Sequence, residues 1–246
     1  MLPAKPSAQT GLPGRGRITS EEIVLDTPDE HQQIRDAVRD LCRQFPDEYF
    51  RRIDAARAYP EAFVDALLDA GWLAAMIPEE YGGSGLGLSA ASVILEEINR
   101  SGGNSAAVHG QMYNMGTLLR HGSRVQKEQY LPAIAAGSLR LQSMAVTEPT
   151  AGTDTTRIGT TAVKKGGRYL VNGQKVWISR VQHSDLMILL ARTTPLAAVK
   201  RKSEGMTIFL VDLRQAIGNG LSVQPIANMV NHETNELFFD NLEIPE

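Results

Sequence analysis

Residues 141–180 read LQSMAVTEPTAGTDTTRIGTTAVKKGGRYLVNGQKVWISR, and this stretch decides the fold. Its first part is a short apolar run that breaks into a loop of small hydroxylated residues. Its last part places Asn172-Gly173 between two β-prone runs. This pattern predicts a hairpin with a type I′ turn, because both turn residues need positive φ. Hydroxyls, backbone N–H groups and Trp177 would then lie close together, which suits a planar ring with polar edges better than a metal ion.

The residues before this stretch have the spacing of helices. Residues 27–30, Thr-Pro-Asp-Glu, carry a cap, a first-turn proline and the acid of a capping box, so a helix is expected to begin there. Cys42 lies on the apolar face that follows and is expected in the core. Ser123 and Gln126 form another capping box. An all-α domain over 27–140 is predicted, with further helices at about 60–70, 88–100, 104–121 and 123–136.

After Leu141 the pattern changes to short β-prone runs separated by Pro, Gly, Asn and Ser. Because helices come first and strands second, a Rossmann sheet is disfavoured and the predicted fold class is α+β. Residues 141–246 are expected to form a small antiparallel β-barrel or sandwich. The predicted strands are 141–147, 160–164, 168–172, 174–179, 185–192, 206–212, 221–226 and 235–240.

The most glycine-rich loop, residues 78–87, invites interpretation as a phosphate cradle. It matches neither G-x-x-x-x-G-K-[ST] nor G-x-G-x-x-G, and no strand pattern precedes it. We therefore expect a tight turn between two helices.

The composition is that of an ordinary soluble globular protein, with 42% of the 246 residues apolar and 22% charged. A net charge of −3 gives no basic surface for nucleic acid. The single cysteine excludes an internal disulfide and a cysteine-rich metal site. No apolar run has the length of a membrane span or the form of a signal-peptide core. Residues 1–26 are expected to be a disordered tail, and a cytoplasmic location is predicted, with the mitochondrial matrix as the alternative.

Two segments carry a family resemblance. Residues 144–154 resemble the flavin-binding signature of the acyl-CoA dehydrogenases, and residues 175–179 resemble the second flavin segment of that family. The resemblance extends from about Thr27 to Glu246 and implies an N-terminal helical domain, a middle β domain and FAD as cofactor. The residues that it implies contact the cofactor are Met144, Val146, Thr147, Gly152, Thr153, Trp177, Ile178 and Ser179.

The resemblance also implies individual roles. Thr147 would hydrogen-bond the pyrimidine edge of the flavin, Trp177 would lie against the ring, and Ser179 would be directed at flavin N5. Thr153 would contact the cofactor's pyrophosphate region and the acyl-CoA, so it is also the expected substrate-binding residue. Gly152 lets a ligand approach the backbone closely.

The chain departs from the family pattern at two positions. Thr153 stands where most members carry serine, and it keeps the hydroxyl. Arg180-Val181 stands where many members continue with Asn-Gly. This second change indicates a divergent subgroup and leaves the length and branching of the acyl chain open.

Other polar residues are weaker candidates. None of the five histidines forms a metal-ligand pair, and His232-Glu233 begins like a zinc-protease motif whose second histidine is missing. No metal site is predicted. Glu96 and Glu97 lie on a helix that matches one near the acyl pocket of relatives, but a solvated helix face explains them equally well. Neither is assigned to the site. The absence of a Gly-x-Ser-x-Gly motif argues against a hydrolase of that architecture.

The family reaction is the α,β-dehydrogenation of an acyl-CoA thioester. A glutamate removes the α proton, the β hydrogen leaves as hydride to flavin N5, and hydrogen bonds polarise the thioester carbonyl. The cofactor carries the redox chemistry. The resemblance further implies electron-transferring flavoprotein as the acceptor and a homo-oligomer at full length.

Relatives continue into a C-terminal helical domain that supplies this glutamate, and no residue of this chain matches it. No catalytic residue is therefore predicted, and the chain is expected to be a truncated FAD-dependent acyl-CoA dehydrogenase. Two alternatives stay open: a flavin oxidase of the same fold, and a non-catalytic module that binds acyl-CoA or a partner.

Overall fold

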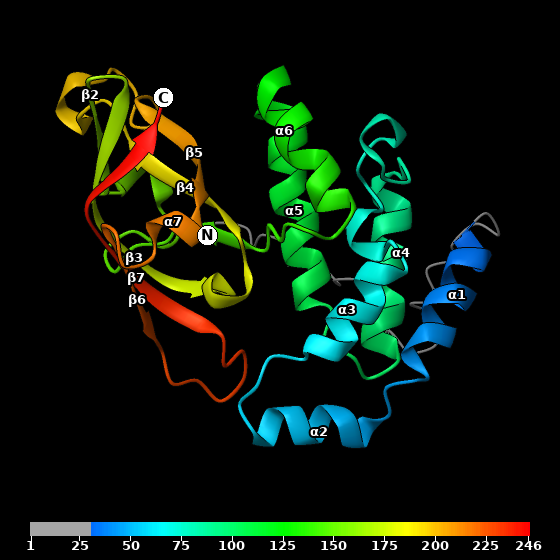
Figure 1. Cartoon of the computed structure of the whole chain (residues 1–246). Helices are drawn as coiled ribbons and strands as arrows, with labels where there is room; N and C mark the ends of the chain where they lie inside the picture. The colour runs from blue at the N-terminus through cyan, green and yellow to red at the C-terminus, as the bar shows by residue number, and fades with distance from the viewer. Residues whose placement is uncertain (1–30) are drawn as a thin grey trace, which may run out of the picture.

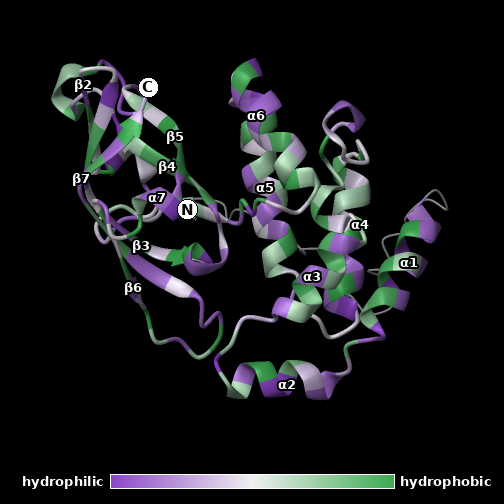
Figure 2. Ribbon diagram, in the orientation of Figure 1, coloured by the Kyte–Doolittle hydropathy of each residue, from purple (hydrophilic) through white to green (hydrophobic). Residues whose placement is uncertain are grey.

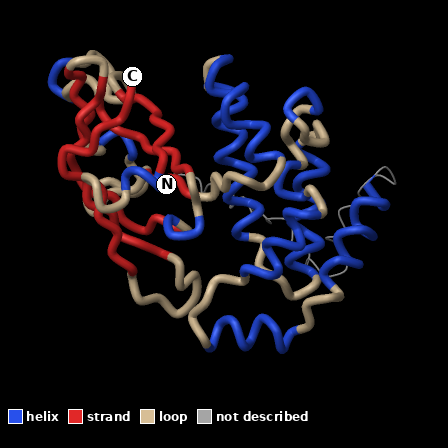
Figure 3. The backbone as a smooth tube through the Cα atoms, in the orientation of Figure 1, coloured by secondary structure: helices blue, strands red, loops and turns tan. Residues whose placement is uncertain are grey.

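The computed structural model describes residues 31–246, which form a helical domain followed by a β domain (Figures 1 and 3). The α+β class is confirmed. The predicted disordered tail and the helix-start signals at 27–30 lie outside the described residues.

The helical domain contains the predicted helix that carries Cys42, the four later predicted helices and one that the sequence did not reveal. The unexpected helix, α2, starts after Pro46 with Asp47 and Glu48 in its first turn, and its Tyr49 and Phe50 pack partly buried against the helical core. The capping box at Ser123 is present with both of its hydrogen bonds. The helices are α1 (Gln32–Cys42), α2 (Asp47–Ala55), α3 (Glu61–Asp69), α4 (Leu88–Arg100), α5 (Ala106–His121) and α6 (Arg124–Ala135).

One apolar cluster holds helices α1 to α5 together. Phe63, Leu67, Ile94 and Val108 are fully buried in it, and Cys42 lies at its edge with 3% of its surface exposed. The expectation of a core cysteine is confirmed, and burial raises the pKa of its thiol.

The glycine-rich loop 78–87 is a tight turn between helices, as expected. It includes a single turn of 3-10 helix at Glu79–Tyr81 and no strand. A Cβ on Gly83 would lie 2.1 Å from the carbonyl oxygen of Ile77, so only glycine fits where the loop passes that backbone.

The β domain is one curled sheet with strand order β1-β4-β2-β3-β7-β6, and β5 pairs with β4. The pairing is mainly antiparallel, but β1 and β2 each run parallel to β4. A short helix, α7 (Leu213–Ala216), follows β5. The strands are β1 (Ser143–Ala145), β2 (Thr161–Lys165), β3 (Arg168–Ser179), β4 (Leu186–Arg192), β5 (Met206–Asp212), β6 (Leu221–Pro225) and β7 (Thr234–Pro245).

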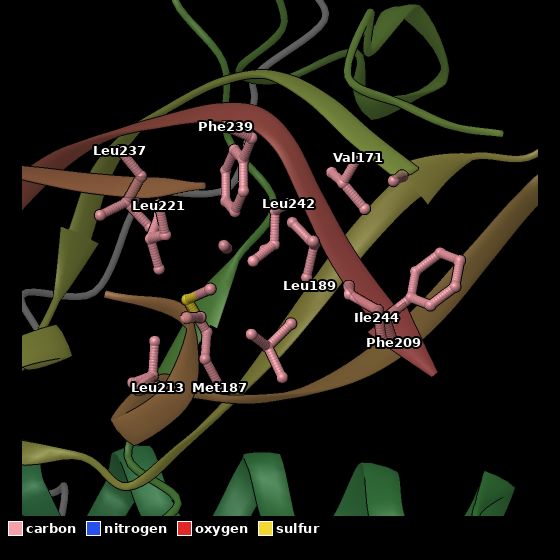
Figure 4. Packing of buried hydrophobic residues seen from close by; sticks show 14 of the residues in the cluster. Val171, Met187, Leu189, Phe209, Leu213, Leu221, Leu237, Phe239, Leu242 and Ile244 are labelled. Carbon is pink, nitrogen blue, oxygen red and sulfur yellow. The ribbon is translucent and has the colours of Figure 1, made fainter. Parts of the chain in front are cut away.

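The sheet curls around its own apolar core. Side chains from β3, β4, β6 and β7 converge there, among them Val171, Leu189, Leu237 and Phe239 (Figure 4). Strands β4 and β5 are apolar along most of their length (Figure 2). All but one residue of β4 is buried, because Met187 and Leu189 face the β core while Leu186 and Ile188 face the apolar cluster shared with the helical domain.

The prediction of a hairpin turn at Asn172-Gly173 is wrong. Strand β3 passes through both residues without turning, and the β2–β3 hairpin turns instead at Gly166-Gly167, whose φ angles are +56° and +76°. Gly173 serves a different purpose. A Cβ on it would lie 2.5 Å from the Thr160 hydroxyl, so glycine is required where β3 packs against that residue.

The two domains meet along α5, which packs beside β1, with α6 also on the sheet side of the helical domain (Figure 1). Arg140, in the connection between the domains, forms ion pairs with Glu61 and Asp65 of α3. Its backbone N–H donates to Asp185 at 2.7 Å. This one residue therefore links α3, the connection and the start of β4.

Candidate functional site

The candidate site lies where the end of β1 meets a bulge in β3. The Val176 N–H donates to the Thr147 carbonyl at 2.9 Å, which joins the two segments. Within β3, Lys175 pairs with Leu237 and Ile178 pairs with Asn235, so Val176 and Trp177 together oppose a single residue of β7. This two-for-one pairing is a β-bulge.

The bulge turns Trp177 outward. Its φ is +63°, a left-handed conformation that bulky residues rarely adopt, and 59% of its surface is exposed. Lys175 and Ile178 are three positions apart and would face opposite sides of a regular strand, yet both are buried. The bulge therefore holds the tryptophan in a strained conformation that exposes it to solvent.

A buried ion pair lies beneath the bulge. The Lys175 ammonium is fully buried and donates to the Val146 carbonyl and to Glu148 Oε1, both at 2.9 Å. Glu148 also accepts from the backbone N–H groups of Gly159 at 2.6 Å and Thr160 at 2.9 Å. Lys175 thereby holds the residues on both sides of Thr147.

The pKa values of both members of this pair are lowered, each for a different reason. Burial acts to raise the pKa of Glu148, but the Gly159 N–H and the Lys175 ammonium outweigh it and leave the pKa below its ordinary value. Burial lowers the pKa of Lys175, against the opposing effect of Glu148. Sequence reasoning did not assign either residue to the site. The sequence does carry one signal for Lys175: it is a lysine in a predicted strand, two positions before Trp177 and next to apolar residues.

Three predicted site residues keep free hydroxyls. The hydroxyls of Thr147, Thr153 and Ser179 make no hydrogen bond to any of residues 31–246. A turn closed by two backbone hydrogen bonds between Glu148 and Ala151 leads directly to Gly152 and Thr153, which are both exposed. Uncommitted hydroxyls beside an exposed aromatic face fit a planar ligand with polar edges, such as a flavin.

The remaining predicted residues do not all face this surface. The Ile178 side chain is buried in the β core, so only its backbone can reach a ligand beside Trp177. Met144 packs into the apolar cluster between the domains. Val146 is half-buried, and its carbonyl is occupied by Lys175.

The arginine that departs from the family pattern lies next to this site and is buried. Arg180 has φ +61°, and its N–H donates to the Glu233 carbonyl at 2.9 Å. Its guanidinium lies against α5 at Gly110, where a Cβ would be 2.7 Å from Nη2. A glycine in α5 thus makes room for this side chain at the domain boundary.

The interpretation of Glu97 as part of a solvated helix face is wrong. Glu97 is fully buried between α1 and α4, and accepts from Arg35 at 2.9 Å and from Arg39 at 3.1 Å. Glu96 is 46% exposed and pairs with Arg35 at 2.9 Å. These contacts hold α1 on α4.

Beyond these contacts, α4 and α5 form an apolar groove of about 320 Å³ that is open to solvent. Leu88 at its rim is 76% exposed. Within residues 31–246, no three His, Cys, Asp or Glu side chains come together as metal ligands, and no helix has the length and apolarity to cross a membrane. The lining of the apolar groove on α4 and α5 includes Met76, Leu88, Leu95, Met112 and Tyr113.

Two family models match the chain. Residues 28–138 match the N-terminal domain of acyl-CoA dehydrogenases, and residues 143–242 match the middle domain. Mitochondrial isovaleryl-CoA dehydrogenase of Pongo abelii is 32% identical over 229 residues, covering 92% of this chain and 53% of the relative. The chain thus spans about half the length of this curated relative.

Solved structures similar to this chain indicate the same family. A glutaryl-CoA dehydrogenase in complex with glutaryl-CoA superposes with a TM-score of 0.80 at 29% identity, over 90% of this chain and 56% of that one. A prolyl acyl carrier protein oxidase superposes with a TM-score of 0.77 at 27% identity, over 89% of this chain and 58% of that one. The chain belongs to the acyl-CoA dehydrogenase family, whose N-terminal and middle domains it carries.

Proposed function

We propose that this chain binds FAD at the β3 bulge and serves the α,β-dehydrogenation of an acyl-CoA thioester. The observation that carries the proposal is Trp177, held outward in a left-handed conformation beside the free hydroxyls of Thr147 and Ser179. When bound, the flavin supplies the acceptor for the hydride that leaves the substrate's β carbon.

The chain's own residues would bind and orient the cofactor. Trp177 offers a flat apolar face that excludes water from one side of the ring. Thr147 and Ser179 offer hydroxyls to its polar edges, and Thr153 offers a third to the pyrophosphate. The buried pair of Lys175 and Glu148 fixes the backbone from which these groups project.

No described residue is assigned as the base that removes the α proton. The two buried glutamates are both committed, Glu97 to two arginines and Glu148 to Lys175 and two backbone N–H groups. A general base needs a free oxygen within reach of the substrate.

The apolar groove on α4 and α5 is the proposed location of the acyl chain. Its lining is aliphatic, aromatic and methionine-rich, which suits a fatty acyl group more than a charged one. Electron-transferring flavoprotein as the acceptor, a homo-oligomeric assembly and a cytoplasmic or mitochondrial-matrix location complete the proposal.

The first experiment is to add FAD to the purified chain, remove the excess and record the visible absorbance. Near-stoichiometric flavin supports the proposed site, and a colourless protein rejects FAD binding by this chain. The Trp72→Phe variant sharpens the test, because it leaves Trp177 as the only tryptophan. Bound FAD should then strongly quench the fluorescence of Trp177. Unchanged fluorescence would contradict the placement of the flavin beside Trp177.

An oxidase of the same fold is the second candidate, and the similarity to a prolyl acyl carrier protein oxidase favours it. The flavin of an oxidase, once reduced, reacts rapidly with oxygen, whereas that of a dehydrogenase reacts slowly. Mixing the reduced flavoprotein with oxygenated buffer in a stopped-flow instrument separates the two. A non-catalytic module would bind acyl-CoA without forming enoyl-CoA.

A further inference from the structure

Arg192, at the end of β4, is buried and bound only by main-chain carbonyls. Its side chain donates through Nε to Ile158 at 3.1 Å, and 4% of its surface is exposed. Nη1 donates to Glu204 at 3.1 Å, and Nη2 donates to Thr156 at 2.5 Å and to Lys202 at 2.9 Å. Within residues 31–246, no carboxylate pairs with it. A buried charge without a counterion is costly, so these four bonds must compensate for its burial.

The four carbonyls belong to two separate loops. Those of Thr156 and Ile158 lie in the loop that begins at Gly152, and those of Lys202 and Glu204 lie in the loop between β4 and β5. Arg192 therefore fastens the two loops to each other and to the end of a central strand.

The first loop is held at two further points. The Asp154 carboxylate accepts from the Thr156 N–H at 3.2 Å, and Glu148 accepts from the N–H groups of Gly159 and Thr160. Every restraint acts on residues 154–160, while Gly152 and Thr153 stay exposed with no side-chain partner among the described residues. The loop is thus rigid where it is anchored and free where a ligand would touch it.

Positive charge gathers where the two loops meet. The Thr156 hydroxyl and N–H lower the pKa of Asp154, and the neighbouring cations Lys202 and Arg157 lower it further. Arg192 adds an unneutralised charge beneath them. These three cations outnumber the Asp154 carboxylate, so the surroundings of Thr153 favour an anion.

We infer that Arg192 is a positioning residue, which fixes the Thr153 loop so that it can receive a pyrophosphate group. The inference rests on the proposed FAD site, and it adds a residue that touches neither the flavin ring nor the acyl chain. Arginine is required because its planar fork reaches four carbonyls in two directions, whereas a lysine ammonium has three donors at one point.

The test compares the whole chain with the variants Arg192→Lys and Thr193→Val by hydrogen exchange and by ligand binding. Thr193 is the matched control, because its hydroxyl bonds Thr207 at 2.8 Å and Gly205 at 3.5 Å, and reaches only the second loop. We expect R192K to speed exchange in both 154–160 and 199–205 by about tenfold or more, since the charged hydrogen bonds are lost. T193V should affect only the second loop.

Ligand binding separates positioning from general loosening. R192K should weaken FAD binding about tenfold and leave binding of riboflavin, which has no phosphate, unchanged. Equal losses for both ligands, or no loss for either, would overturn the inference. If the wild-type chain binds no FAD, the proposed function itself fails.

The wild-type chain provides a check that needs no variant. If R192K does not fold, hydrogen exchange in residues 154–160 of the wild type still tests whether the loop is preformed. Protection close to that of the β core, before any ligand is added, supports a preformed loop. Rapid exchange there would refute it.

Discussion

At the scale of single residues, the proposed site depends on two buried side chains that bond to each other and to the backbone. Lys175 and Glu148 satisfy each other and hold the backbone around Thr147. Their burial is costly, so each depends on the other for compensation. Their role is to define the shape of the site.

Replacing Lys175 with methionine should therefore destabilise the protein strongly. The change keeps most of the side-chain volume but leaves the Glu148 carboxylate buried without its ammonium, and we expect a loss of about 3–5 kcal/mol. Urea unfolding of K175M measures it. The double variant K175M/E148Q should recover part of the loss, and no recovery would show that the two groups act independently.

The same pair predicts a pH dependence. The pKa of Glu148 in the folded protein lies below its ordinary value of 4.5, so near and below that pH the unfolded state binds more protons than the native state. Its contribution to stability is present above pH 4.5 and is lost as the pH falls through the folded pKa. E148Q should be less stable than wild type at pH about 5.5 but should lose less on going to about 3.5. Parallel losses in urea titrations at the two pH values would contradict this assignment.

At the scale of elements, the β3 strand shows how local signals and tertiary contacts compete. Asn172-Gly173 is a strong turn signal, but β7 pairs with β3 on both sides of it, and the strand continues through it with a shift of register. The turn forms at Gly166-Gly167, where both residues have positive φ. Local propensity therefore identified a glycine with a special role but assigned it the wrong one.

A pair of glycine substitutions tests this interpretation. Alanine at Gly173 would place a Cβ 2.5 Å from the Thr160 hydroxyl and 2.7 Å from its Cα, and we expect a loss of about 1–3 kcal/mol in stability. Alanine at Gly166 meets no atom within 4 Å and bears only the strain of positive φ, about 1 kcal/mol. Thermal melting of both variants compares the two costs. An equal loss would mean that the contact with Thr160 is unimportant.

The helices and most strands follow from sequence periodicity, because apolar spacing and caps act locally. The bulge at Trp177 does not, since it arises from how β3 registers with β7, which is more than fifty residues later in the chain. The same bulge turns the Ile178 side chain into the core, so the contact expected of this residue would be made by its backbone. Glu148 gives no signal in the sequence, because its partners are two backbone N–H groups and a lysine 27 residues later.

At the scale of the whole molecule, the domains are joined by a few polar contacts as well as by packing. Arg140 pairs with two carboxylates of α3, and His232 Nε2 lies 2.9 Å from Asp54 across the domain boundary. The Tyr59 hydroxyl donates to Gln142 at 2.7 Å. Such interfaces set how firmly one domain constrains the other.

We expect Arg140→Gln to weaken the coupling between the domains. Calorimetry should show the single unfolding transition broaden or divide, because the partly buried guanidinium forms both ion pairs that join the interdomain connection to α3. Arg124→Gln is the matched control, since that arginine makes one exposed pair with Glu128 inside α6. A transition as sharp as that of wild type in R140Q would show that apolar packing alone joins the domains.

The bulge in β3 also limits which changes of length this strand can accept. Two residues stand opposite one of β7 there, so deleting Val176 would restore regular pairing, keep Lys175 and Ile178 on one side of the sheet, and remove the left-handed conformation that turns Trp177 outward. Substitutions between 175 and 178 change one side chain, whereas this deletion removes the bulge itself. By contrast, a Cβ on either Gly166 or Gly167 would meet no atom within 4 Å, so added residues can extend into solvent at that hairpin tip. Among related chains, length differences in this region should therefore occur at the tip and be absent from the bulge.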